Sequence, residues 1–431
     1  MPRPRRSAPR PRPSTVHEEV GRVVELEVGP VAHGGHCVAR LDGRVVFVRH
    51  SLPGERVRAT ITEGGSRFWR ADAVEVLQAS PDRVEPAWPE AGPDGVGGGE
   101  LAHVALPAQR RWKADVLSDQ LRRIAHIERD VEVEAAPGDD ERGGLGYRTR
   151  VELVAGPDGR AGMRRVRSHD VVALTGMPLA TEEVAALAEA EGVWSRQWTP
   201  GARLELVAPA EGEPVLLVDG TPWRRGRADT RPNARRAVTE LVRLESGEYR
   251  YRVAADGFWQ VHREAPGVLG GAVLDAVGDV AGATVLDLYA GAGLFTLPLA
   301  DAVGTSGRVI AVEGDARAVK DARRNAHDLR HVDLRLGAVD RVLAEGDAGG
   351  AGVPGADVVV LDPPRAGAGR AVVDAIAERA PSRVVYVACD PAALARDVGY
   401  LEERGYELAS LRAFDLFPHT HHVEAVAVLN R

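Results

Sequence analysis

Cysteine, lysine and long apolar runs are what this 431-residue chain most lacks. It holds only two cysteines, Cys37 and Cys389, far apart in the sequence, which argues against a disulfide framework, and we expect a reducing cytoplasm. No apolar run is long enough to span a membrane, and the first residues contain no apolar core of a secretory signal. We therefore expect a cytoplasmic protein that has no membrane partner.

Positive charge comes almost entirely from arginine, and the formal net charge is −8. This balance argues mildly against a nucleic-acid binder, because phosphate contacts need Lys and Arg, although net charge does not report local patches. Residues 1–15, MPRPRRSAPRPRPST, are rich in Arg and Pro and are expected to form a disordered basic tail. A tail of this kind usually serves only to keep a protein in solution, and a tail that contacts RNA is the alternative interpretation.

Short β-branched runs separated by Gly, Pro and Asp-Gly turns fill residues 16–78. The stretch LDGRVVFV predicts a hairpin with Asp42 and Gly43 in its turn. Five such runs in about sixty residues predict a small closed barrel of the oligonucleotide-binding (OB) type. A generic small β domain is the alternative, which periodicity alone does not exclude.

Three further regions follow the barrel. Residues 79–105 are rich in Pro and Gly and are expected to be a linker segment. Residues 106–262 open with an expected helix and then mix helix-like and strand-like stretches, which predicts a central α+β domain. In residues 263–431 apolar runs alternate with helical segments, so we predict an α/β fold with a Rossmann-like, doubly wound parallel sheet.

The first motif of this sheet is VLDLYAGAGLFTLPLA, residues 285–300. Gly291 and Gly293 let the backbone approach a ligand without a Cβ in the way. The next apolar run, VIAVE, ends in Glu313, at a spacing that suits a carboxylate bonding to ribose hydroxyls. Because the three-glycine dinucleotide fingerprint is incomplete, we expect S-adenosylmethionine, which has no pyrophosphate to cradle.

Two further strand ends carry Asp362 and Cys389. The run VVVLDPPRAG puts Asp362 before two prolines, where it can face a planar polar group or a methyl donor, and a merely stiff loop is the alternative. Cys389, in RVVYVACDP, precedes an expected helix whose N-terminus lowers the pKa of a thiol and favours the thiolate. A small buried hydrophobe is the alternative. Against it, Asp287, Glu313 and Asp362 are expected at the same edge of the sheet.

A carboxylate, Glu424, interrupts the last apolar stretch, FDLFPHTHHVEAVAVL. Partial burial should raise the pKa of Glu424, which suits a proton acceptor, and a strand-edge glutamate facing water is the alternative. His419, His421 and His422 resemble a metal cluster, but no partner Cys or carboxylate spacing supports one, so we expect no metal site. A thiolate, a base and a methyl donor on one edge suit methylation of carbon 5 of uracil.

The sequence resembles the bacterial RNA uracil-5 methyltransferase family. The segments DLYAGAGLFTLPLA, DPPRAG, ACDPAALARD and DLFPHTHHVEAVAVL are similar to its signature segments, in the same order. GFWQVHREA, residues 257–265, is similar to its cofactor-binding lead-in, and the barrel to its RNA-binding TRAM domain. The resemblance covers nearly the whole chain after the basic tail. It implies a discontinuous catalytic domain, in which the linker segment 79–105 joins the residues from about 263 onward.

The resemblance also implies a role for each matching residue. Cys389 would be the nucleophile and Glu424 the proton acceptor. The residues that would bind S-adenosylmethionine are Gln260, Tyr289, Glu313 and Asp362, with Asp340 a further candidate near the adenine. Many members carry a four-cysteine iron–sulfur site between the barrel and the central domain. The matching region here has no cysteine, so we expect no iron–sulfur cluster.

We expect the partner to be structured RNA, with ribosomal RNA favoured over transfer RNA because the barrel is present, and the protein to be a monomer. Two other functions stay open. An amino methyltransferase acting on adenine or glutamine could use the Asp-Pro-Pro motif and would need no thiol. A non-catalytic RNA-binding or chaperone protein would need neither the thiol nor the cofactor.

Overall fold

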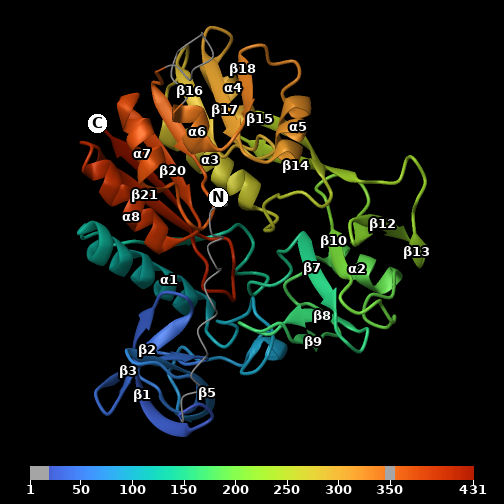
Figure 1. Ribbon diagram of the computed structural model, residues 1–431, viewed down its shortest axis with the longest axis vertical. Coiled ribbons are helices and arrows are strands. Elements are labelled where there is room, and N and C mark those ends of the chain that lie inside the picture. The colour runs from blue at the N-terminus through green and yellow to red at the C-terminus, as the bar shows by residue number, and fades with distance from the viewer. Residues whose placement is uncertain (1–18, 345–354) are drawn as a thin grey trace, which may run out of the picture. The chain divides into compact units, whose positions relative to one another are not determined.

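The computed structural model describes residues 19–344 and 355–431. They form two compact units, one up to residue 83 and one from residue 84 onward (Figure 1). The expected basic tail, residues 1–15, lies outside the described residues. None of the described helices is long and apolar enough to cross a membrane.

Five strands close a small barrel in the first unit, as the sequence predicted. They are β1 (Val23–Ala32), β2 (His36–Leu41), β3 (Arg44–Arg49), β4 (Arg56–Glu63) and β5 (Phe68–Gln78), in the order β1-β2-β3-β5-β4. Alternate side chains point inward, so Val46, Val48 and Ile61 are fully buried. The β2–β3 hairpin turns at Asp42 and Gly43, whose φ angles of 49° and 81° fit a two-residue turn.

An antiparallel seven-stranded sheet forms the central part of the second unit, in the order β13-β12-β11-β10-β7-β8-β9. Its strands are β7 (Arg150–Ala155), β8 (Ala161–Arg164), β9 (Val171–Ala173), β10 (Arg203–Val207), β11 (Val215–Val218), β12 (Thr221–Arg224) and β13 (Arg227–Ala228). Helix α2 (Glu182–Ala190) packs beside it, and the hydroxyl of Thr181 caps the helix by accepting a hydrogen bond from the N–H of Val184.

An eight-stranded sheet forms the largest part of the second unit, in the order β18-β17-β16-β19-β20-β22-β21-β6. Its strands are β6 (Val133–Ala135), β16 (Thr284–Leu288), β17 (Arg308–Glu313), β18 (Val332–Leu336), β19 (Val358–Leu361), β20 (Arg383–Ala388), β21 (Glu407–Asp415) and β22 (Glu424–Asn430). The strands from β18 to β20 are parallel, whereas β22 runs antiparallel to β20. Parallel strands buried on both faces need apolar residues at every position, which explains the continuous runs in the sequence.

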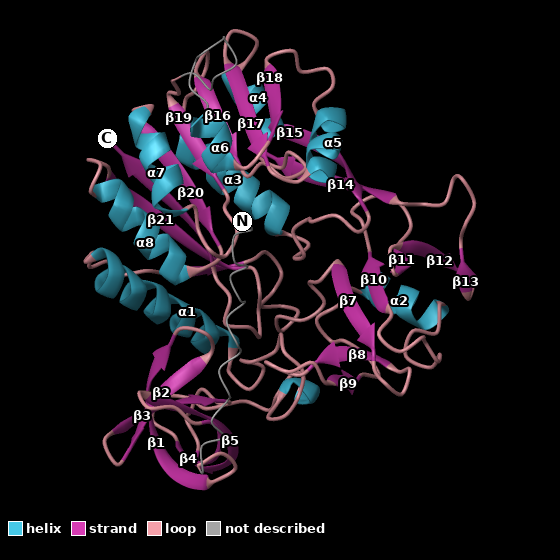
Figure 2. Cartoon of the chain, viewed as in Figure 1, coloured by secondary structure: helices cyan, strands magenta, loops and turns pink. Residues whose placement is uncertain are grey.

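Helices cover both faces of this sheet, which is the predicted doubly wound fold (Figure 2). They are α1 (Leu106–Gln120) with a π turn at Leu121–Ala125, α3 (Ala265–Val277), α4 (Thr296–Val303), α5 (Ala316–Asn325), α6 (Val339–Ala344), α7 (Gly369–Glu378) and α8 (Pro391–Glu402). Neighbouring residues of a strand point to opposite faces. Leu286 therefore packs in the hydrophobic cluster with α7 and α8, and Val285 packs in the cluster with α3 and α4.

Two segments that we assigned to the central domain pack instead on the eight-stranded sheet. Leu117 and Leu121 share a hydrophobic cluster with this sheet, and β6 pairs with β21. The hairpin of β14 (Ala237–Leu244) and β15 (Gly247–Ala254) packs Tyr251 and Val253 on the face that α3 covers. The packing thus groups parts of residues 106–262 with the eight-stranded sheet, because their apolar residues share its hydrophobic clusters.

Strand β22 occupies an interior position in the sheet, although it follows the other strands in the chain. It lies between β20 and β21, with Ala425 opposite Ala388 of β20. Because β22 is antiparallel, its first residue, Glu424, lies at the edge where the parallel strands end. The topology therefore brings Glu424 beside Cys389, the residue that follows β20.

Candidate active site

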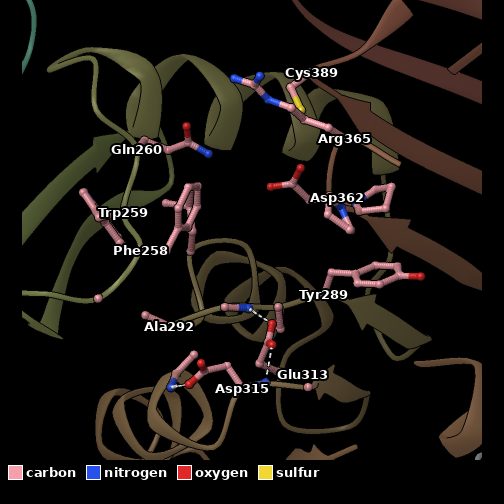
Figure 3. Close-up of a pocket in the computed structure, with 18 of the residues that line it drawn as sticks. Phe258, Trp259, Gln260, Tyr289, Ala292, Glu313, Asp315, Asp362, Arg365 and Cys389 are labelled. Carbon is pink, nitrogen blue, oxygen red and sulfur yellow. Dashed lines mark hydrogen bonds between the residues drawn. The ribbon is translucent and has the colours of Figure 1, made fainter. Parts of the chain in front are cut away.

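A cavity of about 1100 Å³ lies at the carboxyl ends of the parallel strands, where doubly wound sheets bind their ligands. Pockets for one small molecule have volumes of roughly 300–1,000 Å³, so this cavity has room for more than one ligand. Gln260 and Phe258 face it from one side, and Cys389, Asp362 and Tyr289 face it from the other (Figure 3).

The turn after β16 and the end of β17 form one wall of the cavity. Gly291 has a φ angle of 56°, which glycine adopts without strain, and no atom lies within 4 Å of the place of a Cβ. The carboxylate of Glu313 accepts hydrogen bonds from the backbone N–H of Gly291 at 2.9 Å and of Asp315 at 2.6 Å. The carboxylate expected at this strand end is therefore fixed in place, with lone pairs left for a ligand hydroxyl.

Three other residues expected at the cofactor line the same cavity. Tyr289 is half-buried and has a φ angle of 63°, which is uncommon for a residue other than glycine. Gln260 points its amide into the cavity (Figure 3), and Asp340 is exposed in the first turn of α6. The structure thus brings all three to one space together with Glu313 and Asp362.

The aspartates at the ends of β16 and β19 have different surroundings. Asp362 follows β19 and faces the cavity (Figure 3), and burial, with the charge of Asp287 second, raises the pKa of Asp362 to about 7. Asp287 is 1% exposed, accepts a hydrogen bond from the hydroxyl of Thr296 and does not line the cavity. Asp287, which we expected at the ligand edge of the sheet together with Glu313 and Asp362, is therefore buried inside β16 and does not reach the cavity.

Cys389 and Glu424 lie at neighbouring strand ends and both line the cavity. Ala388 and Ala425 are opposite each other in β20 and β22, so Cys389 and Glu424 are the next residues outward. Side chains opposite each other in such a ladder have Cβ atoms roughly 5 Å apart. Cys389 is half-buried, whereas only 5% of Glu424 is exposed.

Glu424 is a buried carboxyl group, and the positive charge of Arg365 favours its ionised form. Burial raises the pKa of Glu424 well above its ordinary value, the charge of Asp362 acts in the same direction and the charge of Arg365 opposes it. This is the environment that the sequence predicted for this carboxylate. Once ionised, a carboxylate with a raised pKa is a stronger proton acceptor than an exposed one.

The thiol of Cys389 differs from the prediction. The helix after it begins at Pro391, as expected. Burial nevertheless raises the pKa of Cys389 to about 12, the charges of Glu424 and Asp362 add to this effect, and only Arg365 opposes it. The expectation that the pKa of this thiol is lowered is wrong, because desolvation and the nearby carboxylates raise it.

Asp397 fastens the loop between β19 and α7, which carries Arg365. Its buried carboxylate, on α8, accepts hydrogen bonds from the backbone N–H of Ala368 at 2.7 Å and of Gly369 at 3.2 Å. The same oxygen accepts a hydrogen bond from the hydroxyl of Tyr386 at 2.7 Å. The loop that follows Asp-Pro-Pro is therefore tied to the helix that follows Cys389.

Helix α1 holds the segment that leads into β22. The ammonium of Lys113 is buried and donates to the carboxylate of Asp415 at 2.5 Å. The side-chain oxygen of Gln109, also buried, accepts a hydrogen bond from the backbone N–H of His419 at 2.6 Å. We call Gln109 and Lys113 the α1 clamp. The clamp fixes the approach to Glu424 from a helix about 300 residues earlier in the chain.

The three histidines near β22 have separate partners. The ring of His419 bonds to a backbone carbonyl at 2.9 Å, His421 lies 3.6 Å from the carboxylate of Glu100, and His422 lies 3.3 Å from a guanidinium nitrogen of Arg365. Burial, and secondly His421, lowers the pKa of His422 to about 3, so its neutral ring can accept from Arg365. Among residues 19–344 and 355–431 no group of three or more His, Cys, Asp or Glu is placed to hold a metal ion.

Phe258, Arg365 and His422 also line the cavity, and the sequence predicted no role at a ligand site for any of them. Phe258 is 77% exposed, so its ring is accessible at the cavity. Arg365 is exposed, lines the cavity and lies close enough to Cys389 for its charge to act on the thiol. An aromatic residue two positions before Gln260 and an arginine directly after Asp-Pro-Pro were signals for two of them.

The residues of the cavity fit S-adenosylmethionine. Glu313 presents a fixed carboxylate where ribose hydroxyls can bond, and the glycine turn leaves room for close approach. Leu294 and Val339 add apolar surface, which suits an adenine ring, and the carboxylate of Asp362 suits a cationic group.

Two family profiles match the chain: TRAM domain, over residues 17–74, and tRNA (Uracil-5-)-methyltransferase, over residues 355–431. Curated relatives match nearly its whole length. An uncharacterized RNA methyltransferase of Bifidobacterium longum is 45% identical, over 94% of this chain and 96% of the relative. An uncharacterized RNA methyltransferase of Streptomyces coelicolor is 44% identical, over 95% of this chain and 93% of the relative.

The fold is also similar to a solved structure, the tRNA (uracil-54, C5)-methyltransferase of Pyrococcus abyssi in complex with S-adenosyl-L-homocysteine. The TM-score is 0.66, and the match covers 94% of this chain and 100% of that chain. The two sequences are 24% identical, so the likeness is one of fold.

Proposed function

The chain belongs to the S-adenosylmethionine-dependent RNA methyltransferases of the uracil-5 type, and from this premise we propose that it methylates carbon 5 of a uridine through a covalent bond between Cys389 and carbon 6. The observation that carries the proposal is the pair formed by Cys389 and Glu424 at adjacent strand ends of one cavity. The non-catalytic alternative does not fit the relatives, which are RNA methyltransferases.

The reaction begins with activation of the pyrimidine, because carbon 5 of uracil is a poor nucleophile. Addition of the sulfur of Cys389 to carbon 6 forms a C–S bond and moves the electrons of the C5–C6 double bond into an enolate. The thiol proton leaves in this step. Arg365 favours the thiolate, and Asp362, whose charge acts on the thiol, is the proposed acceptor of its proton, which leaves Glu424 ionised for the last step.

S-adenosylmethionine, when bound, supplies an electrophilic methyl group to carbon 5. The residues proposed to hold it are Gln260, Tyr289, Glu313, Asp340 and Asp362, all of which line the cavity. The backbone bonds that hold Glu313 mean that this carboxylate needs no rearrangement to receive the ribose.

Glu424 is proposed to complete the reaction. Its carboxylate removes the proton from carbon 5, and the electrons of that C–H bond restore the C5–C6 double bond and expel Cys389 as a thiolate. The buried position of Glu424 keeps water away from the proton being moved. The uridine must leave its stack to reach both residues, at a cost of roughly a few kcal/mol. The exposed ring of Phe258 at the cavity offers a surface for stacking.

The decisive test uses the two cysteines of the chain as target and control. Methyl transfer from S-adenosylmethionine to RNA should be lost in Cys389→Ala and in Cys389→Ser, because neither variant can form the adduct. Cys37→Ala, which alters the other cysteine, inside the barrel, should keep the activity. Methyl transfer that survives in Cys389→Ala would instead favour an amino methyltransferase acting on adenine or glutamine.

The proposed partner is structured RNA, with ribosomal RNA favoured over transfer RNA because the chain carries a barrel of the RNA-binding type. We propose that the barrel, residues 16–78, binds RNA outside the cavity, and that a monomer acts in the cytoplasm. Mapping 5-methyluridine in both RNA classes from a deletion strain and its parent tests the target. A site missing only from ribosomal RNA fits the proposal, and one missing only from transfer RNA overturns it.

A further inference from the structure

We infer that an arginine-rich arm of the central sheet binds the phosphate backbone of the RNA substrate outside the cavity, an inference that rests on the proposed function. The arm is defined as residues 221–236, which form β12, β13 and the loop before β14. It contains six arginines and one carboxylate, a net charge of +5 (6 − 1), in a chain whose net charge is −8. The arginines are Arg224, Arg225, Arg227, Arg231, Arg235 and Arg236.

The arginines of the arm are all exposed. Arg231 pairs with Asp229 at 2.7 Å, and Arg235 lies 3.7 Å from the carboxylate of Glu213. Within the described part of the chain, no carboxylate lies within ion-pair distance of the three hairpin arginines, Arg224, Arg225 and Arg227. The charge of Arg224 acts on Asp229, and Glu191 lies at the turn, but neither carboxylate is bound to a guanidinium of the three, so these groups can contact an anionic partner.

The hairpin of the arm is fixed rather than loose. Its turn residues, Arg225 and Gly226, have φ angles of 52° and 76°, and both backbone N–H groups donate to the carboxylate of Glu191 at 2.8 and 2.9 Å. Trp223 of β12 packs on Trp198, with ring centroids 5.3 Å apart. A hairpin that is already fixed in this way loses less conformational freedom on binding than a disordered basic segment does.

The position of the arm suits a contact with distant parts of a folded RNA. None of residues 221–236 lines the cavity. β13 is the outermost strand of the seven-stranded sheet, and the arm lies beside α2 (Figure 1). Phosphates occur along the whole of an RNA chain, and arginines that neutralise them release counterions, which favours binding. The competing explanation is that charged residues protect an outer strand from pairing with another chain.

The test compares two triple variants that remove equal charge. The arm variant is Arg224→Gln/Arg225→Gln/Arg227→Gln, and the control is Arg122→Gln/Arg123→Gln/Arg330→Gln, which alters three exposed arginines elsewhere. The probes are 23S ribosomal RNA and total transfer RNA purified from a strain that lacks the enzyme. The dissociation constant is measured by filter binding over a range of salt concentrations, together with the kcat at saturating RNA.

The arm variant should bind the substrate RNA at least roughly tenfold more weakly, a loss of about 1.4 kcal/mol. The slope of log K against log salt should become flatter by about 2 to 3, because each phosphate contact contributes about 0.7 to 0.9. The kcat and the affinity for S-adenosylmethionine should not change, since no residue of the arm lines the cavity. The control should retain the wild-type affinity and slope.

An unchanged dissociation constant and salt slope in the arm variant overturn the inference. If the same variant also elutes as a larger species in size-exclusion chromatography, its arginines protect the sheet edge instead. The binding readout does not depend on methylation. A wild-type protein that binds RNA through the arm but methylates neither RNA class would contradict the proposed function and leave the arm supported.

Discussion

Glu424 and Cys389 reach the cavity from adjacent strands, and each is proposed to act in a different step. In Glu424→Gln the addition and the methyl transfer should still occur, but the proton on carbon 5 would have no acceptor. Protein should therefore stay joined to RNA, as a slow band on a denaturing gel that requires both S-adenosylmethionine and Cys389.

The matched control for this prediction is Glu205→Gln. Glu205 is also buried, and its pKa is also raised mainly by burial, but it does not line the cavity. This control should turn over normally and leave no adduct. If Glu424→Gln gives no adduct with any RNA that the wild type methylates, Glu424 is not the base.

The charge of Arg365 should set the pH range of the reaction. Arg365 lowers the pKa of both Cys389 and Glu424, and both groups act in their deprotonated forms, so the rate should rise with pH. In Arg365→Gln both pKa values increase, and the rise should move to higher pH, with the largest loss of rate at low pH.

Single-turnover rates between about pH 6 and 9 check this, with RNA and cofactor saturating. Arg365→Lys keeps the charge and should keep the wild-type profile. A Gln variant that is slower by the same factor at every pH would mean that Arg365 acts by contact with the substrate and not by its charge.

At the scale of elements, the α1 clamp joins the start of the catalytic unit to the end of β21 and the loop that leads into β22. Lys113→Met leaves Asp415 buried without its cation, which should destabilise the protein by about 3–5 kcal/mol. Lys113→Met/Asp415→Leu removes both charges and should recover most of that stability. We expect the double variant to unfold near the wild-type temperature but to keep a lowered kcat, because β22 has lost its anchor.

Thermal unfolding and single-turnover methylation, measured on the same samples, separate the two effects. A kcat that recovers together with the unfolding temperature would show that the pair serves folding only. Gln109→Met tests the other half of the clamp and should slow release of the adduct, because His419 is no longer held.

The elements that the sequence predicted best are the strands that consist of a continuous run of apolar residues. The apolar runs of β16, β17, β19, β20 and β22 are buried on both faces, so their ends, and with them Glu313, Asp362 and Cys389, could be located from the residues. Strands β18 and β21 lie nearer the sheet edges and mix polar with apolar residues, and β6 has only three residues.

Tertiary neighbours decided what the sequence did not predict. The pKa of Cys389 depends first on burial and then on the charges of Glu424 and Asp362, all of which arise only in the folded sheet, so the local helix signal pointed in the wrong direction. The packing of α1 on the catalytic sheet likewise depends on contacts such as Lys113 with Asp415, about 300 residues apart. Both sets of contacts join residues that are far apart in the chain, so they are not visible in any short stretch of the sequence.

At the scale of the whole molecule, the two compact units predict separable functions. Every residue that lines the cavity follows residue 83, and the second unit has its own hydrophobic clusters. A chain that starts at residue 84 should therefore fold and bind S-adenosylmethionine normally. It should methylate RNA with a kcat/KM lowered by roughly tenfold or more, equivalent to about 1.4 kcal/mol of lost RNA contact.

Calorimetric titration with S-adenosylmethionine and methylation kinetics test this prediction on the shortened and the full chain. A shortened chain with unchanged kcat/KM would mean that the barrel adds nothing to substrate binding. Loss of cofactor binding in a shortened chain that still unfolds cooperatively would mean that the cavity depends on the barrel.

The late arrival of β22 has a consequence for the newly made protein. Domains fold as units during synthesis, N-terminal parts first, and here the slot between β20 and β21 stays vacant until residues 424–430 leave the ribosome. A nascent chain would then carry the reactive sulfur without its partner carboxylate. Until β22 enters that slot, such an intermediate would be able to form the proposed bond to a pyrimidine but would lack the proposed means of breaking it.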